Sequence, residues 1–227
     1  MLALLLLAPA LANTKYDNYI RDKVHGDGWH WSGKLRGGDV VVEPSNGNGG
    51  LDIGGALIHD WTGEIFIPGV KLDRVVSFLQ DYDEQANYFR PEVIQTHLLS
   101  RDGNTWNISY RLVQTKVVTV MLDVDQTVTW FPVSPTRVYT TGNATHIAEV
   151  RDATGRPGKD HGYLWRLNTY WWMEEKDGGV YVESRSVSLS RTPPFGLGWL
   201  FNPIVSSLPG ESLARQLAAT RKAVLSR

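Results

Sequence analysis

The order of the periodic segments is the feature that most constrains the fold of this chain. Residues 56–227 read as one strand, one helix, a long run of alternating strands and a final amphipathic helix. Long antiparallel sheets twist and curve, so we expect the single terminal helix to lie against one face of the sheet. Since one helix seldom fills such a face, the pattern predicts an internal apolar cavity.

The individual segments follow from local patterns. Residues 72–79 have apolar side chains at i, i+3, i+4 and i+7, which predicts a helix that continues as a second short piece toward Pro91. Residues 102–104 are typical of a hairpin turn. The sequence predicts strands over 57–68, 93–101, 106–112, 118–130, 137–150, 163–175 and 180–191, and a last helix over 209–225 with Pro209 in its first turn.

The composition excludes several functional classes. A net charge of −1 gives no basic field, so we expect no nucleic-acid partner. The absence of cysteine excludes disulfides, thiolate metal sites and a cysteine nucleophile. The histidines fall in different predicted elements, so we expect no metal site. The glycine-rich stretch 37–55 lacks the spacing and the following helix of a nucleotide-binding loop, so we expect no cofactor.

The N-terminal region divides the chain into three predicted parts. Met1–Ala12 is an apolar run with an A-x-A end, typical of a secretory signal peptide and shorter than the roughly 20 residues of a membrane-spanning helix. The positive segment that normally precedes such a run is missing, so the run is either an export signal whose start lies upstream or an accidental likeness. Residues 13–55 form an extension with a short helical pattern at 16–24, and 56–227 form the main domain. We expect a periplasmic or secreted protein.

Three passages resemble a known superfamily. The strand and helix from Ile65 to Val93, the LLSRDG hairpin at 98–103 and the stretch from Trp171 to Val182 with its glycine turn resemble the START and polyketide-cyclase helix-grip (SRPBCC) superfamily. The resemblance covers roughly residues 56–225 and rests on structural rather than catalytic motifs.

The resemblance implies an α+β helix-grip fold. In this fold a curved, seven-stranded antiparallel sheet wraps round a long C-terminal helix, and a short helical pair follows the first strand. The resemblance also implies that lipids, sterols, polyketides or other apolar molecules are held between sheet and helix. The segment DHGYLWRLNTYWW and the first 55 residues are not general features of the superfamily, and they indicate a separate branch.

Residues on the apolar faces of the strands and the last helix are candidates for the cavity wall. Ligand pockets are mainly apolar and aromatic with a few polar groups, and ordinary core packing is the alternative for each residue. His59 and His146 have apolar neighbours, so each is either a hydrogen-bonded core residue or a polar anchor, and we predict no catalytic residue. The predicted ligand pocket consists of Trp106, Tyr110, Leu112, Val120, Leu122, His146, Trp165, Leu167, Trp171, Leu213 and Leu217.

The opposite face of the same strands carries polar side chains. Arg166, Asn168 and Tyr170 alternate with Trp165, and Arg185 lies on the next strand. If this face is wet, they are ordinary solvated groups; if it lines the cavity, an arginine would bind a carboxylate. We favour the wet face, because Trp165 would otherwise meet water.

Three functions remain open on these observations. We predict first the binding and transport of a hydrophobic small molecule or lipid by a protein that is not an enzyme. The alternatives are an enzyme of the polyketide cyclase or dehydratase type, which would use polar groups in the same cavity, and a partner-binding module that docks through residues 13–55. The apolar stretch Phe195–Phe201 either makes transient membrane contact as a lid or packs on the sheet.

Overall fold

The structure is a computed structural model that describes residues 2–24, 35, 38–47, 49–115, 119–150, 162–192 and 198–226, with the side chains of 2–9 and 198–206 outside the described set. The elements, in chain order, are α1 (Leu2–Lys23), β1 (Val40–Pro44), β2 (Leu51–Asp52), β3 (Ala56–Pro68), α2 (Leu72–Gln80), the 3-10 helix η1 (Tyr82–Glu84), α3 (Gln85–Tyr88), β4 (Val93–Asp102), β5 (Thr105–Thr115), β6 (Thr119–Ser134), β7 (Arg137–Val150), β8 (Leu164–Lys176), β9 (Gly179–Arg191) and α4 (Gly198–Ser226).

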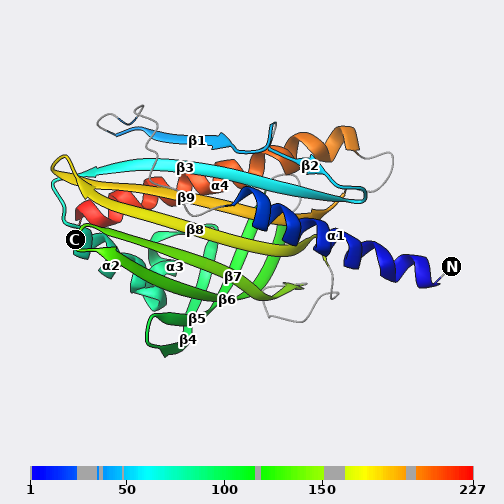
Figure 1. The fold of residues 1–227 in the computed structure, drawn as a ribbon, viewed down its shortest axis with the longest axis horizontal. Coiled ribbons are helices and arrows are strands. Elements are labelled where there is room, and N and C mark those ends of the chain that lie inside the picture. Colours follow the sequence, from blue (N-terminus) through cyan, green and yellow to red (C-terminus); the bar gives the residue numbers. More distant parts are fainter. Residues whose placement is uncertain are drawn as a thin grey trace.

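All the strands join one antiparallel sheet (Figure 1). Its order is β1, β3, β9, β8, β7, β6, β5, β4, and β2 also pairs with β3. Strands β4 to β9 follow one another along the chain, and β3 pairs with β9 along its whole length. The prediction of seven strands is wrong, because the N-terminal extension adds β1 and β2 to the edge that β3 would otherwise expose.

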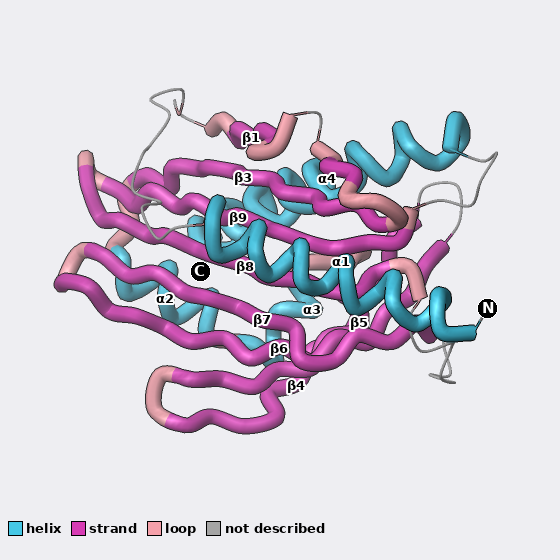
Figure 2. Tube along the Cα trace, turned by 45° about the vertical axis from the view of Figure 1, so that its right-hand side comes forward, coloured by secondary structure: helices cyan, strands magenta, loops and turns pink. Residues whose placement is uncertain are grey.

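Helix α4 packs on one face of this sheet, which we call the inner face, and its main contacts are with β3 and β1 (Figures 1 and 2). A side chain at Gly63 of β3 would collide with Leu217 and crowd Leu213 of the helix. A side chain at Gly210 of the helix would collide with the ring of Trp61. One glycine on each element therefore permits the close approach of helix and sheet.

The start of α4 differs from the prediction. The helix begins at Gly198, eleven residues before the Pro209 that we expected in its first turn. Proline removes one backbone N–H and crowds the preceding turn, which is why the pattern favoured a start there. Residues 193–197 and the side chains up to 206 lie outside the described residues, so the prediction for Phe195–Phe201 is not addressed. Among the described residues, no helix combines the length and the apolar character needed to cross a membrane.

The opposite, outer face of the sheet is partly covered by α1 (Figures 1 and 2). Tyr16 is 0% exposed, and its hydroxyl oxygen lies 2.9 Å from Asn168 Oδ1 and 2.8 Å from the carbonyl oxygen of Val187. Arg166 donates to Asp17 of α1 at 2.8 Å. The prediction of a wet face is therefore wrong around these residues, because the helix shields apolar outer-face side chains from water. The shielded side chains are Ala56, Ile58, Val187 and Leu189.

A buried ion pair joins α1 to the outer face. The side chain of Asp60 on β3 is 0% exposed, and Arg185 on β9 donates to both of its oxygens at 2.8 and 2.6 Å. The Tyr19 hydroxyl of α1 donates to the same carboxylate at 2.8 Å, and Arg185 also donates to the carbonyl oxygen of Lys23. Burial raises the pKa of Tyr19 to about 12, so this hydroxyl remains a donor at neutral pH. The three side chains form one network.

A carboxyl pair on the same face makes stability depend on pH. Glu183 stands opposite Glu64 across β9 and β3, and burial together with the Glu64 carboxylate raises the pKa of Glu183 from 4.5 to about 8, against the opposing effect of Arg185. The folded state thus holds a proton that the unfolded state releases, so the contribution of Glu183 to the free energy of unfolding is full below pH 4.5 and is lost as the pH rises through about 8.

We therefore expect Glu183→Gln to remove this pH dependence. Between about pH 5 and about pH 9 the parent protein loses the contribution of Glu183 and the variant does not. The free energy of unfolding of the variant minus that of the parent should therefore rise by on the order of 1 kcal/mol or more over this range. Urea unfolding at the two pH values measures the difference. Parallel curves for the two proteins would mean that Glu183 is already ionised in the folded state.

Candidate functional site: a cavity between the sheet and the last helix

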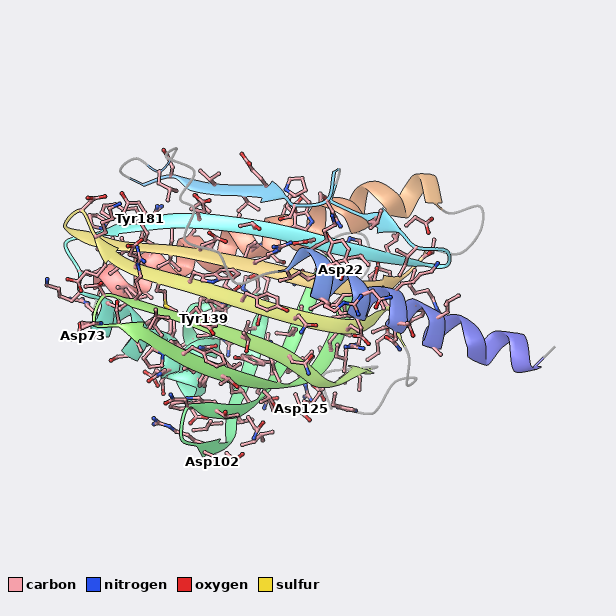
Figure 3. The ribbon with its side chains drawn as sticks, in the orientation of Figure 1. Asp22, Asp73, Asp102, Asp125, Tyr139 and Tyr181 are labelled. Atoms are coloured by element: carbon pink, nitrogen blue, oxygen red, sulfur yellow. The ribbon has the colours of Figure 1, made fainter. Side chains whose placement is uncertain are left out.

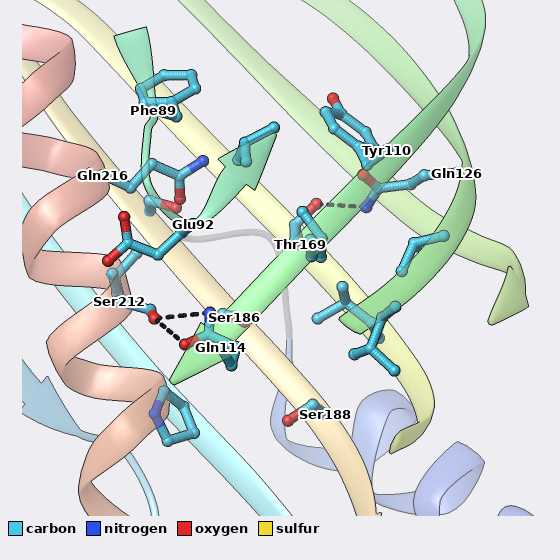
Figure 4. A pocket seen from close by; sticks show the side chains of 18 of the residues that line it. Phe89, Glu92, Tyr110, Gln114, Gln126, Thr169, Ser186, Ser188, Ser212 and Gln216 are labelled. Atoms are coloured by element: carbon cyan, nitrogen blue, oxygen red, sulfur yellow. Dashed lines mark hydrogen bonds between the residues drawn. The ribbon is translucent and has the colours of Figure 1, made fainter. Parts of the chain in front are cut away.

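A cavity of about 670 Å³ lies between α4 and the inner face of the sheet (Figure 4). Its wall includes residues of β3 to β9, of the α2–α3 region and of α4. Ligand pockets occupy roughly 300–1,000 Å³, so the space suits a small organic molecule. Carbon side chains form most of the wall, among them Leu79, Phe89, Leu112, Val120, Leu122, Val124, Leu167 and Leu213.

Small side chains on β9 leave this space open. Serine occupies every second position from Ser184 to Ser190, and all four serines face the cavity because side chains alternate along a strand. On the neighbouring strand Thr169 stands opposite Ser186. Larger residues at these positions would reach across toward α4. The small side chains of β9 and β8 therefore help to keep the cavity open.

Two side-chain hydrogen bonds join residues of the cavity wall (Figure 4). Gln126 Nε2 donates to Thr169 Oγ1 at 2.8 Å, and a side chain at Gly142 would collide with both of these groups. Gln114 Nε2 donates to Ser212 Oγ at 3.0 Å and so ties β5 to α4. The wall thus offers amide and hydroxyl groups, which recognise oxygen atoms of a ligand without carrying charge.

The residues of the described wall that carry a charge at neutral pH are Arg90, Glu92 and Arg215, and none of them is buried. Arg90 and Arg215 are exposed, and Glu92, which directly precedes β4, forms an ion pair with Arg215 of α4. Because Glu92 and Arg215 satisfy each other, the pair offers no free charge to a ligand inside.

His59 is the one histidine in the described wall. Its Nδ1 lies 3.1 Å from the carbonyl oxygen of Gly49, and its Nε2 lies 2.8 Å from Ser190 Oγ. Burial lowers the pKa of His59, so the ring is neutral at pH 7. The histidine is a hydrogen-bonded core residue that also forms part of the cavity wall.

Two tyrosines border the cavity beside the α2–α3 region. Trp130 Nε1 donates to the Tyr82 hydroxyl at 3.0 Å, and the Tyr110 hydroxyl donates to Gln85 Oε1 at 3.4 Å. Burial raises the pKa of both tyrosines, so neither supplies a phenolate at neutral pH. They act as neutral hydrogen-bonding groups.

The structure brings seven of the eleven predicted pocket residues to the cavity wall and places four elsewhere. Trp106 is buried against Tyr82 and lies under the guanidinium of Arg101, and Leu217 is fully buried against Gly63. Both belong to the packed core, Trp106 through its contact with Tyr82 and Leu217 because the helix and the sheet meet too closely at Gly63 to leave space. The seven residues at the wall are Tyr110, Leu112, Val120, Leu122, Leu167, Trp171 and Leu213.

Irregular pairing moves the other two residues to the outer face. The register between β6 and β7 shifts at Thr145, so His146 points outward, 59% exposed and 3.8 Å from Asp125. The register between β8 and β9 shifts at Trp165, so Leu164 faces the cavity and Trp165 packs beside the cluster under α1. A bulge adds one residue to a strand and reverses the alternation beyond it, which is why both predictions are wrong.

Several cavity residues were not predicted. The alternation of serine from Ser184 to Ser190 is visible in the sequence and would have indicated a polar stripe on β9. Gln126 and Tyr163 have no comparable signal, because a single polar residue in a strand fits either face. Among the described residues, no group of three His, Asp or Glu side chains could hold a metal ion.

Comparisons with known proteins place the fold. No protein-family model matches the sequence, and no curated protein matches it. A protein of Thermus thermophilus has a similar structure with a TM-score of 0.56 and 16% identity, over 73% of this chain and 96% of that chain. A STAR-related lipid transfer protein from Xanthomonas axonopodis has a TM-score of 0.52 and 17% identity, over 78% of this chain and 99% of that chain. The Zhui aromatase/cyclase from a Streptomyces species has a TM-score of 0.54 and 8% identity, over 75% of this chain and 95% of that chain.

These likenesses confirm the expected resemblance at the level of structure: the chain has the helix-grip fold, which it shares with a STAR-related lipid transfer protein and an aromatase/cyclase.

Proposed function

We propose that this protein binds, and carries, a hydrophobic small molecule or lipid in the cavity between the sheet and α4. The observation that carries the proposal is the cavity itself, about 670 Å³ in volume and walled mainly by carbon. A folded protein gains free energy by filling such a space with side chains, so a hollow of this size is costly unless a ligand occupies it.

The structural neighbours support the same proposal. One of them is named for lipid transfer, and its likeness covers 78% of this chain. Following the export signal predicted at Met1–Ala12, we further propose that the ligand is met in the periplasm or outside the cell.

An enzyme of the cyclase type is the second candidate. Its support is the hydrogen-bonded pair Gln126 and Thr169 inside the cavity and the likeness to an aromatase/cyclase. A general base at neutral pH needs a group with a suitable pKa and an orienting partner. The His59 ring contacts a carbonyl group and a hydroxyl group rather than a carboxylate, which favours binding over catalysis.

Native mass spectrometry of protein purified from its own host tests the binding proposal. We expect a bound species of added mass, and we expect solvent extraction to release an apolar compound. The same preparation, once delipidated, should take up an apolar fluorescent dye in a one-to-one ratio. Protein that carries no compound and takes up no dye would contradict the proposal, whereas conversion of an added polyketide analogue would favour the enzyme.

A further inference from the structure

A hydrogen bond on the inner face of the sheet spans three strands (Figure 4). Gln126 of β6 donates from Nε2 to Thr169 Oγ1 of β8 at 2.8 Å, although β7 lies between these two strands. The bond passes over Gly142 of β7, where a side chain would collide with both partners. Glycine weakens a strand interior and often marks a place where another group approaches the backbone closely. The glycine therefore makes room for this bond.

The bond fixes the Thr169 hydroxyl as a donor toward the cavity. Its oxygen accepts from the Gln126 amide, and no described residue accepts its hydrogen. Ser186 of β9 is the cross-strand partner of Thr169, and its hydroxyl forms no hydrogen bond with a described residue. Both side chains belong to the cavity wall and both are half-buried, so they keep surface that a ligand can reach. Two hydroxyl donors thus stand side by side on neighbouring strands.

Two adjacent donors match an oxygen atom that accepts two hydrogen bonds. A carbonyl oxygen has two lone pairs and no hydrogen of its own. A carboxylate also accepts, but the described wall residues of β7, β8 and β9 include no cation to balance its charge, and an unpaired charge in an apolar site is costly. A pure hydrocarbon would cover both hydroxyls and leave them without a partner. The two hydroxyls therefore favour an uncharged carbonyl group.

We propose that Thr169 and Ser186 form a subsite that binds the carbonyl oxygen of an uncharged apolar ligand, such as a ketone or an ester. Gln126 is a positioning residue, because it acts through the Thr169 hydroxyl. The subsite rests on the proposed function of the cavity and narrows its ligand class to molecules that carry such an oxygen. The carbon part of the ligand packs against the apolar side chains of β5, β6 and α4 in the same wall.

Three naphthalene derivatives of similar size test the subsite: acetylnaphthalene, ethylnaphthalene and naphthoate, substituted at the same ring position. Binding to the delipidated protein is measured by equilibrium dialysis at about pH 7, where the acid is ionised. We expect the ketone to bind at least about tenfold more tightly than naphthoate. Ser186→Ala and Thr169→Val each remove one hydroxyl donor. Each should weaken binding of the ketone about two- to tenfold and leave binding of ethylnaphthalene unchanged.

Two further variants separate the loss of a donor from a change of shape. Thr169→Ser keeps the hydroxyl and should keep the affinity for the ketone. Thr141→Val is the matched control for Thr169→Val, because Thr141 lies with Tyr139 on the outer face of β7 (Figure 3), on the opposite side of the strand from Thr140 of the cavity wall. This control should change none of the three affinities.

The possible failures of the subsite and of the proposed function are distinguishable. The subsite is wrong, and the proposed function stands, if naphthoate binds the parent protein as tightly as the ketone. The same conclusion follows if Ser186→Ala and Thr169→Val leave binding of the ketone unchanged, or weaken binding of the ketone and of ethylnaphthalene equally. If none of the three probes binds the parent protein, the proposed function fails as well.

Discussion

Replacing Asp60 with alanine is expected to lower the free energy of unfolding by about 3–5 kcal/mol. The carboxylate is fully buried, it accepts two hydrogen bonds from Arg185, and it accepts a third from Tyr19 of α1. Its removal leaves the Arg185 guanidinium, whose side chain is only 16% exposed, without its anion in a place that water scarcely reaches. The cost of that unpaired charge is the main part of the effect.

Urea unfolding of the parent and the variant measures this loss. Asp17→Ala is the matched control, because it breaks an exposed ion pair, between Asp17 of α1 and Arg166 of β8, whose side chains are 58% and 30% exposed. Exposed pairs contribute about 0–1 kcal/mol, so the control should lose little. A loss in Asp60→Ala no larger than in Asp17→Ala would show that burial of the Asp60 network adds nothing to stability.

Replacing Ser186 with phenylalanine is expected to weaken ligand binding at least about tenfold, because the ring would occupy space now open beneath α4. Ser186 faces the cavity between Trp61 of β3 and Thr169 of β8. Overfilling a packed core costs typically 1–3 kcal/mol, but a ring that enters an existing hollow should cost less. Loss of binding with retained stability would therefore be the signature of a filled cavity.

Dye uptake and urea unfolding are measured together on this variant. Ser77→Phe makes the same change at an exposed position of α2 and should alter neither property. Full dye uptake by a folded Ser186→Phe protein would place the binding site outside this cavity. A large fall in stability would instead mean that side chains, rather than a ligand, fill the space in front of Ser186.

Much of the fold could be predicted because each segment carries its own signal. The apolar repeat of residues 72–79 forms α2, with Leu72, Val75 and Leu79 buried, and residues 102–104 form the turn between β4 and β5. Long strands joined by short turns leave few ways to pair. The antiparallel order and the position of the last helix against the sheet follow from these local patterns.

The position of α1 could not be predicted in this way. Tyr16 and Tyr19 fall at helical spacing, but spacing does not say which surface a helix covers. The answer depends on partners more than 40 residues away in sequence, such as Asp60, Asn168 and Val187. Alternation alone made this face look wet, because it shows which side chains share a face and not what lies above them.

The candidate site was predicted best where the strands are regular. Leu167 and Trp171 of β8 reach the cavity wall as alternation requires, whereas Trp165 and His146 stand at or beside bulges and do not. Sequence patterns seldom reveal a bulge, since it depends on how two strands pair. The distinction between wall and packed core, as for Leu217, depends on how closely the helix approaches Gly63.

The two-sided use of β3 and β9 limits how the length of this protein can change. Neighbouring residues serve opposite purposes: His59 and Ser186 border the hollow, while Asp60 and Arg185 hold the N-terminal helix. Inserting or deleting one residue within either strand would move its inner-face side chains to the outer face and its outer-face side chains to the inner face. A charged residue of the Asp60–Arg185 pair would then point into the cavity. Homologous chains should therefore vary in length at hairpin ends such as Asp177-Gly178. Changes to the shape of the cavity should therefore be made by substitutions that keep the length and the register of these strands.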